Sequence, residues 1–260
     1  MDISSVDSRR PSLFLATLSE SRDYLPLLRW LILMCLTVFG LVTLWQLNVL
    51  QAMFATDRTH ISSLILGLFA LTSLHCLVQI WHISRELVAT RSYQALLRAD
   101  LDHPSMAFDD LKRAPKGSTI ARHIDNLVAK ARSQGGGRLD QTLLLRVLAN
   151  QLHGRERLGL FVSEALLRLA LLGTALGFIL MLIPIAGLSA FDAETLRKAL
   201  SGMSGGMAIA LNITVTGIGT ALVLKLEYYF LGMGVVELIH AITEVTEVYV
   251  ISVLERRGNG

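Results

Sequence analysis

The sequence is short of charged side chains and of cysteine, and both shortages narrow the class of protein. Asp, Glu, Lys and Arg make up 17% of the 260 residues, against about 25% in a typical soluble domain. The deficit is concentrated in a few long apolar blocks, which is the pattern of a membrane protein. Cys35 and Cys76 both lie inside such blocks, so we expect them to act as small apolar side chains and not as zinc ligands.

Motifs of catalysis and of nucleic-acid binding are also missing. The sequence has no GxSxG, HExxH, P-loop or DxDxG pattern, and such patterns mark the common hydrolases and nucleotide- or metal-binding sites. No basic run is long enough to indicate a nucleic-acid surface. His75 and His82 share a helix face, where we expect an interface role, with a proton relay as the alternative. We therefore expect no enzyme, no cofactor, no metal site and no nucleic-acid partner.

Four apolar blocks are present instead, at about residues 30–50, 61–83, 158–188 and 205–224. A helix needs roughly 20 apolar residues to cross the hydrocarbon core of a bilayer. Backbone groups in lipid must form hydrogen bonds within their own segment, so each block is expected to be a helix. The sequence therefore predicts an all-α membrane protein with four transmembrane helices.

The distribution of Lys and Arg predicts the orientation of these helices. The segment before the first block holds four, residues 85–157 hold thirteen and the tail after the fourth block holds three. The loop between the first two blocks holds one, and the loop between the last two holds two. Because Lys and Arg concentrate on the cytoplasmic side, we expect both termini and the middle segment in the cytoplasm.

The expected organisation has five parts. Apolar residues in the middle segment recur at helical spacing, which predicts a small helical bundle that is too short for a catalytic domain. The parts are a cytoplasmic N-terminal segment (1–29), transmembrane helices 1 and 2 (30–83), a cytoplasmic helical segment (84–157), transmembrane helices 3 and 4 (158–224) and a cytoplasmic helical extension (225–260).

Small and hydroxyl-bearing residues distinguish the third and fourth blocks from the first two. Small residues allow close helix packing, and polar residues inside a membrane are candidates for function. The packing residues are Gly173, Gly177, Gly206, Ala210 and Gly217. The polar residues are Thr174, Asn212, Thr214 and Thr216. Together they predict either a narrow polar path or plain helix packing.

Neither of these two blocks contains a membrane-centre Asp or Glu. Hydroxyls hold water or an ion but do not titrate, so a proton path through them needs a carboxylate from elsewhere. Glu164 and Arg168, four residues apart at one end of the third block, are expected to pair with each other at the membrane interface, with a relay as the alternative.

The motif LLGTALG, followed by GGMAIALNITVTGIGTALVLKLEYY, resembles the two pore helices of the MotA/TolQ/ExbB proton-channel family. Members read approximately LLGTVxGx and GIAxALxxTxxGLxxAIPxxxxYN, and the resemblance covers residues 164–230. Ile209 stands where the TolQ/ExbB branch carries Glu, and Pro184 lies away from the position of the MotA-like proline, so the subfamily stays open. The matching positions are Gly173, Thr174, Gly177, Gly206, Ala208, Ala210, Leu211, Thr214 and Gly217.

The resemblance implies a pore-forming subunit of an ion-driven motor in the bacterial inner membrane. Such subunits form a homo-pentamer around two copies of a single-span partner similar to MotB, TolR or ExbD. The partner supplies a membrane Asp, which the residues at Thr174 and Thr214 face, and ion flow drives rotation. The resemblance implies H+ as the transported ion, with Na+ open, and leaves the driven machine open. A structural scaffold and a self-contained transporter are the alternatives.

A polar stripe follows the fourth block. Glu237, His240, Glu244 and Glu247 are spaced three, four and three residues apart and share one helix face. A fifth span here would place three glutamates in lipid, which is costly. In a pentamer the stripe would place acidic rings at the inner mouth of the pore, where they would concentrate cations. The alternative is a solvated helix face.

Overall fold

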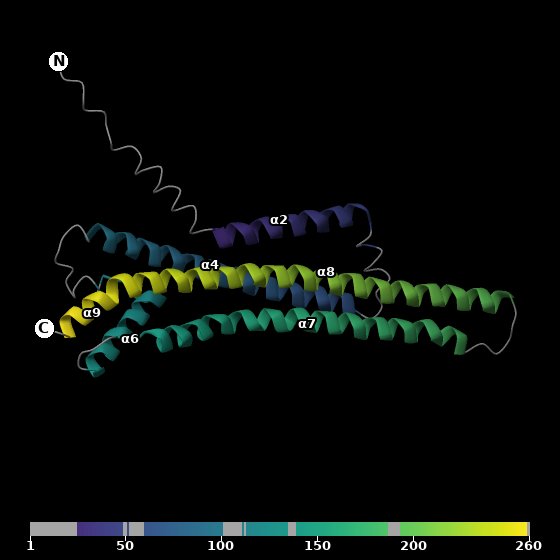
Figure 1. Ribbon diagram of the computed structural model, residues 1–260. Coiled ribbons are helices and arrows are strands. Elements are labelled where there is room, and N and C mark those ends of the chain that lie inside the picture. The colour runs from purple at the N-terminus through teal and green to yellow at the C-terminus, as the bar shows by residue number, and fades with distance from the viewer. Residues whose placement is uncertain are drawn as a thin grey trace, which may run out of the picture. The chain divides into compact units, whose positions relative to one another are not determined.

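The computed structural model describes residues 25–48, 51, 60–100, 111, 113–134, 139–186 and 193–258. Every regular element in these ranges is helical and none is a strand (Figure 1). The expected N-terminal segment up to residue 24, most of the loop after the first block and the loop at 187–192 lie outside the described residues.

Four long helices carry the apolar blocks. They are α2 (Leu25–Gln46), α4 (Ile61–Asp100), α7 (Thr142–Ala186) and α8 (Ala193–Val245). Each is long and apolar enough to cross a membrane. The chain is therefore an all-α, multi-pass membrane protein with four candidate spans, which confirms that part of the prediction.

Three of these helices continue well beyond their apolar blocks. Helix α4 continues to Asp100, α7 begins at Thr142, and α8 occupies all of Ala193–Val245. The segment SRELVATRSYQALLRAD at the end of α4 has no Gly or Pro and contains many good helix formers. Hydropathy detects only the apolar stretch, so the blocks underestimate the lengths of the helices.

The chain divides into two compact units. The described residues of unit 1 lie within 25–29, 79–154 and 231–258, and those of unit 2 lie within 30–78 and 155–230. Helices α4, α7 and α8 each contribute residues to both units.

Unit 1 also contains the short helices of the chain. Helix α6 (Thr119–Gln134) is amphipathic and buries Ile120, Ile124 and Leu127. After α8 the chain makes one π-helical turn (Thr246–Val250) and continues as α9 (Ile251–Gly258). Thr246 in this turn is buried, and its hydroxyl donates a hydrogen bond to Gln141 Oε1 at 2.8 Å.

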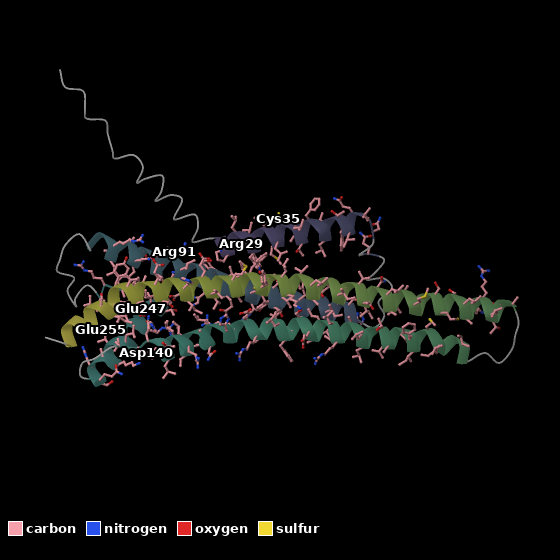
Figure 2. All side chains as sticks on the ribbon, in the orientation of Figure 1. Arg29, Cys35, Arg91, Asp140, Glu247 and Glu255 are labelled. Carbon is pink, nitrogen blue, oxygen red and sulfur yellow. The ribbon has the colours of Figure 1, made fainter. Side chains whose placement is uncertain are left out.

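Carboxylates and amides hold the elements of unit 1 together. The Glu86 carboxylate on α4 accepts a hydrogen bond from the backbone N–H of Thr119 at 2.7 Å and so caps the start of α6. Glu255 of α9 accepts one from the Leu139 N–H at 2.9 Å, beside Asp140 (Figure 2). These contacts occupy backbone donors that would otherwise lack a partner at the ends of elements.

Candidate functional site

The third and fourth apolar blocks pack against each other as an antiparallel helix pair in unit 2. Gly173 on α7 meets Ile213 on α8, and Gly177 meets Ala210. The Ser163 hydroxyl donates a hydrogen bond to the Ala221 carbonyl at 3.0 Å. The residue numbers of the contacts thus fall along α8 as they rise along α7, which is the pattern of an antiparallel pair. The two ribbons lie side by side in Figure 1. We call this contact the α7–α8 seam.

Glycine is needed at the seam because the helix backbones approach closely. A Cβ on Gly177 would lie 2.6 Å from the Ala210 Cβ, and a Cβ on Gly206 would lie 2.6 Å from the Met181 backbone nitrogen. Real Cβ atoms do not approach other heavy atoms this closely. A Cβ on Gly217 would likewise collide with Ala170. All five predicted packing residues therefore lie in the seam, with Ala210 as the partner of Gly177.

The threonines near the seam direct their hydroxyl protons to their own helices. Thr174 donates to the Leu171 carbonyl at 2.6 Å, Thr214 to the Ala210 carbonyl at 3.0 Å and Thr216 to the Asn212 carbonyl at 2.7 Å. A hydroxyl with its proton engaged still has lone pairs that accept hydrogen bonds. These side chains are therefore suited to receive a proton donor from outside the helix pair.

The four predicted pathway residues lie on two sides of the seam. Thr174 follows Gly173, and Thr214 follows Ile213, its contact across the seam. In an antiparallel pair, residues one position after the contact residues fall on the same side. Asn212 and Thr216 precede contact residues and so fall on the opposite side, where Thr216 is buried. The structure therefore places Thr174 and Thr214 together and separates them from Asn212 and Thr216.

The side of the seam that holds Thr174 and Thr214 is otherwise apolar and exposed. Both threonines are half-buried. The other residues that come one position after a seam contact lie on the same side, and several of them are large, apolar and exposed. These are Leu171, Phe178, Leu182, Met207, Leu211 and Ile218. Because each hydroxyl is bonded to its own helix, as that of the exposed Thr43 on α2 also is, this face can contact lipid or a partner helix.

Unit 2 also contains a carboxylate that the sequence analysis missed. Glu227 on α8 is fully buried. Its Oε2 accepts a hydrogen bond from the Trp30 indole N–H of α2 at 3.3 Å, while its Oε1 has no hydrogen-bond partner among the described residues. Ser73 on α4 is a further polar neighbour of the carboxylate.

Tyr228, the next residue, anchors the same region to α4 and α7. Its ring lies against the backbone of Gly159, where any Cβ would overlap it. Its hydroxyl lies 2.9 Å from His75 Nδ1 and donates to the Thr72 carbonyl at 3.4 Å. His75 thus lies at a helix interface, as expected, and its imidazole is bonded to a buried phenol. Cys76 beside it is buried.

A periodic signal for Glu227 was present in the sequence. Glu227 lies seven residues after Thr220 and three after Leu224, and both of these are buried. This spacing places all three on one helix face. The block boundary at 224 separated Glu227 from the apolar stretch, and Lys225 marked that point as polar. Lys225 itself is exposed.

The acidic stripe of unit 1 contacts neighbouring side chains. Glu237 pairs with Arg91 of α4 at 2.5 Å, and Glu244 accepts a hydrogen bond from Gln94 at 2.9 Å. Glu247 accepts one from Gln141, and Figure 2 labels Arg91 and Glu247 within this unit. His240 is exposed. Three members of the stripe therefore contact side chains of other helical segments within unit 1.

The interfacial pair expected at Glu164 and Arg168 forms, at 3.2 Å, with both side chains exposed. Such a pair contributes little to stability.

Comparison of the chain with family models, with curated proteins and with solved structures gives no match. The resemblance to the MotA/TolQ/ExbB family rests on the motifs of the α7–α8 seam, and membership of that family is a proposal.

Proposed function

We propose that the chain is the pore-forming subunit of an ion-driven motor in a bacterial inner membrane, with H+ as the transported ion. In this proposal both termini and the segment between α4 and α7 lie in the cytoplasm. Five copies surround two single-span partner helices, and each partner carries the membrane Asp that binds the ion. The chain converts the proton motive force into mechanical work together with that partner.

One observation carries the proposal: Thr174 and Thr214 lie on the same side of the α7–α8 seam and keep only acceptor capacity. Each hydroxyl donates within its own helix, so the energetic cost of exposing it to an apolar surrounding is reduced. The remaining lone pairs suit a protonated carboxylic acid, which is a donor. A scaffold explains the glycines of the seam but gives no reason for two hydroxyls at matched positions.

The apolar surroundings of the two threonines support a helical partner. Leu171 and Leu211 are 68% and 59% exposed in the single chain, and they lie beside Thr174 and Thr214. A single-span helix with one Asp would cover apolar surface and direct its acid to the hydroxyls. A hydrogen bond between a neutral acid and a hydroxyl contributes about 0.5–1.5 kcal/mol, which corresponds to a roughly 2- to 12-fold change in an equilibrium or rate.

The test replaces Thr174 or Thr214 with Val in the assembled complex in proteoliposomes. We expect ion flux to fall several-fold, by up to about tenfold, while native mass spectrometry shows an unchanged assembly. Thr43→Val is the matched control, since Thr43 on α2 also donates only to its own helix, at 2.9 Å to Phe39, and lies away from the seam. Wild-type flux in both seam variants, or an assembly that contains this chain alone, would overturn the proposal.

A further inference from the structure

We propose that Glu227 is a proton-binding site of this chain itself, held in the helix packing of unit 2 by the Trp30 indole. The proposal concerns an acid within the chain, whereas the motor proposal takes its acid from a partner. It needs no partner and stands or falls separately from the role of Thr174 and Thr214.

Burial without a counter-charge favours the neutral acid at this position. The Glu227 side chain is fully buried. No ion pair joins it to a Lys, Arg or His in the described part of the chain. An ionised carboxylate that is removed from water without a paired cation is several kcal/mol less stable than one in solvent. The environment therefore holds a proton on this group.

The hydrogen bonds place that proton on one oxygen. The Trp30 N–H donates to Oε2, so Oε2 acts as the carbonyl oxygen of the neutral acid. The proton then lies on Oε1, which has no hydrogen-bond partner among the described residues, and the nearby Ser73 hydroxyl donates to Met34 Sδ at 3.7 Å. A buried hydroxyl without an acceptor is suited to exchange with an entering water or with a polar group from another chain. A purely structural carboxylate would be expected to have both oxygens occupied.

The titratable neighbours do not neutralise a charge on Glu227. On α4 they are Cys76, which is buried, and His75, which is bonded to Tyr228. On α8 they are Tyr228, whose hydroxyl is engaged by His75 and Thr72, and Lys225, which is exposed. From α2, Trp30 contacts the Glu227 carboxylate. From α7, Gly159 contacts the ring of Tyr228. A thiol and a phenol beside the carboxylate add no positive charge.

His75 and Tyr228 provide a second exchangeable pair beside this acid. In one tautomer of His75, Nδ1–H donates to the Tyr228 oxygen, and the Tyr228 hydroxyl donates to the Thr72 carbonyl. In the other tautomer, the Tyr228 hydroxyl donates to Nδ1. His75 is half-buried, so this hydrogen-bonded pair lies at the edge of the packing that encloses Glu227.

The experiment uses the full chain alone, in phosphatidylcholine liposomes, with dicyclohexylcarbodiimide as the probe. The O–H of a protonated carboxylic acid adds across one C=N bond of the carbodiimide. The resulting O-acylisourea rearranges to a stable N-acylurea, which peptide mass spectrometry locates. We expect Glu227 to be labelled at mildly acidic pH, and labelling to fall about tenfold per pH unit once the acid ionises.

Infrared spectroscopy supplies a readout that does not depend on access of the probe. We expect the C=O stretching band of a protonated carboxylic acid in wild-type protein, its loss in Glu227→Gln and its retention in Glu164→Gln, since Glu164 is an exposed carboxylate of the same unit. An unlabelled Glu227 with an acid band that Glu227→Gln leaves unchanged would overturn the proposal. If that variant does not fold, the pH titration of the wild-type band and of labelling decides in the same way.

Because this experiment contains no partner, its failure leaves the motor proposal intact. Wild-type flux in the threonine variants would, conversely, leave Glu227 as a protonatable site in a chain that works by itself.

Discussion

Polar side chains serve different purposes in the two units. In unit 1 the carboxylates connect elements: Glu86 caps α6, Glu237 pairs with Arg91, and Glu255 accepts from the Leu139 N–H. In unit 2 the hydroxyls of Thr174 and Thr214 bond only to their own helices, and Glu227 keeps one oxygen without a partner among the described residues. Polar groups that stabilise a fold are satisfied within it. Thr174, Thr214 and Glu227 keep unused hydrogen-bonding capacity, whereas Ser163 and Tyr228 of the same unit bond to neighbouring helices, so these three residues are the candidates for function in unit 2.

The largest expected effect is on the α7–α8 seam. Gly206→Leu places a side chain against the Met181 backbone, which cannot move aside, so we expect the variant to lose about 3 kcal/mol or more of stability. Thermal unfolding of the detergent-solubilised chain measures this. Gly205→Leu is the matched control, because a Cβ on Gly205 meets nothing within 4 Å. Equal stability of the two variants would contradict the close approach at the seam.

The second prediction compares the two buried carboxylates directly. Glu86→Leu leaves the buried Thr119 N–H without its acceptor, and we expect a loss of about 1–3 kcal/mol. Glu227→Leu also removes an acceptor, that of the Trp30 indole N–H, but this hydrogen bond is longer, at 3.3 Å, and the other carboxylate oxygen has no partner among the described residues, so we expect a smaller loss, of about 1 kcal/mol or less. Chemical denaturation of both variants gives the two values. A larger loss for Glu227→Leu than for Glu86→Leu would remove the contrast between the units.

The smallest expected effect is a pH dependence in unit 1. Burial lowers the pKa of His123, against a smaller opposing influence from its hydrogen bond to Gln141. The unfolded chain therefore binds a proton more readily than the fold does, so stability is full above the usual histidine pKa of about 6.5 and falls as pH drops below it. Thermal unfolding over a pH series measures this slope. His123→Gln, which does not titrate, should flatten it, and an equal slope in both proteins would contradict the assignment.

Much of the fold was accessible from the sequence because lipid imposes a strong constraint. A span needs about 20 apolar residues and an internally bonded backbone, and the four blocks meet both conditions. The contacts of Gly173, Gly177 and Gly217 follow the same logic, since small residues at a spacing of three or four mark a close helix contact. The continuation of α4 to Asp100 and of α7 back to Thr142 left a weaker signal, because hydropathy falls where the helix becomes amphipathic.

The amino-acid sequence by itself determined that this chain is helical and that it has four segments able to cross a membrane. It also determined that two of these segments are rich in small residues and carry hydroxyls. Only the tertiary structure decided that Thr174 and Thr214 share one side of the seam while Asn212 and Thr216 lie on the other. It also decided that Glu227 is enclosed beside Trp30. Side-chain periodicity fixes which residues share a face of one helix, but which face is covered, and by what, depends on contacts between segments that are far apart in the chain.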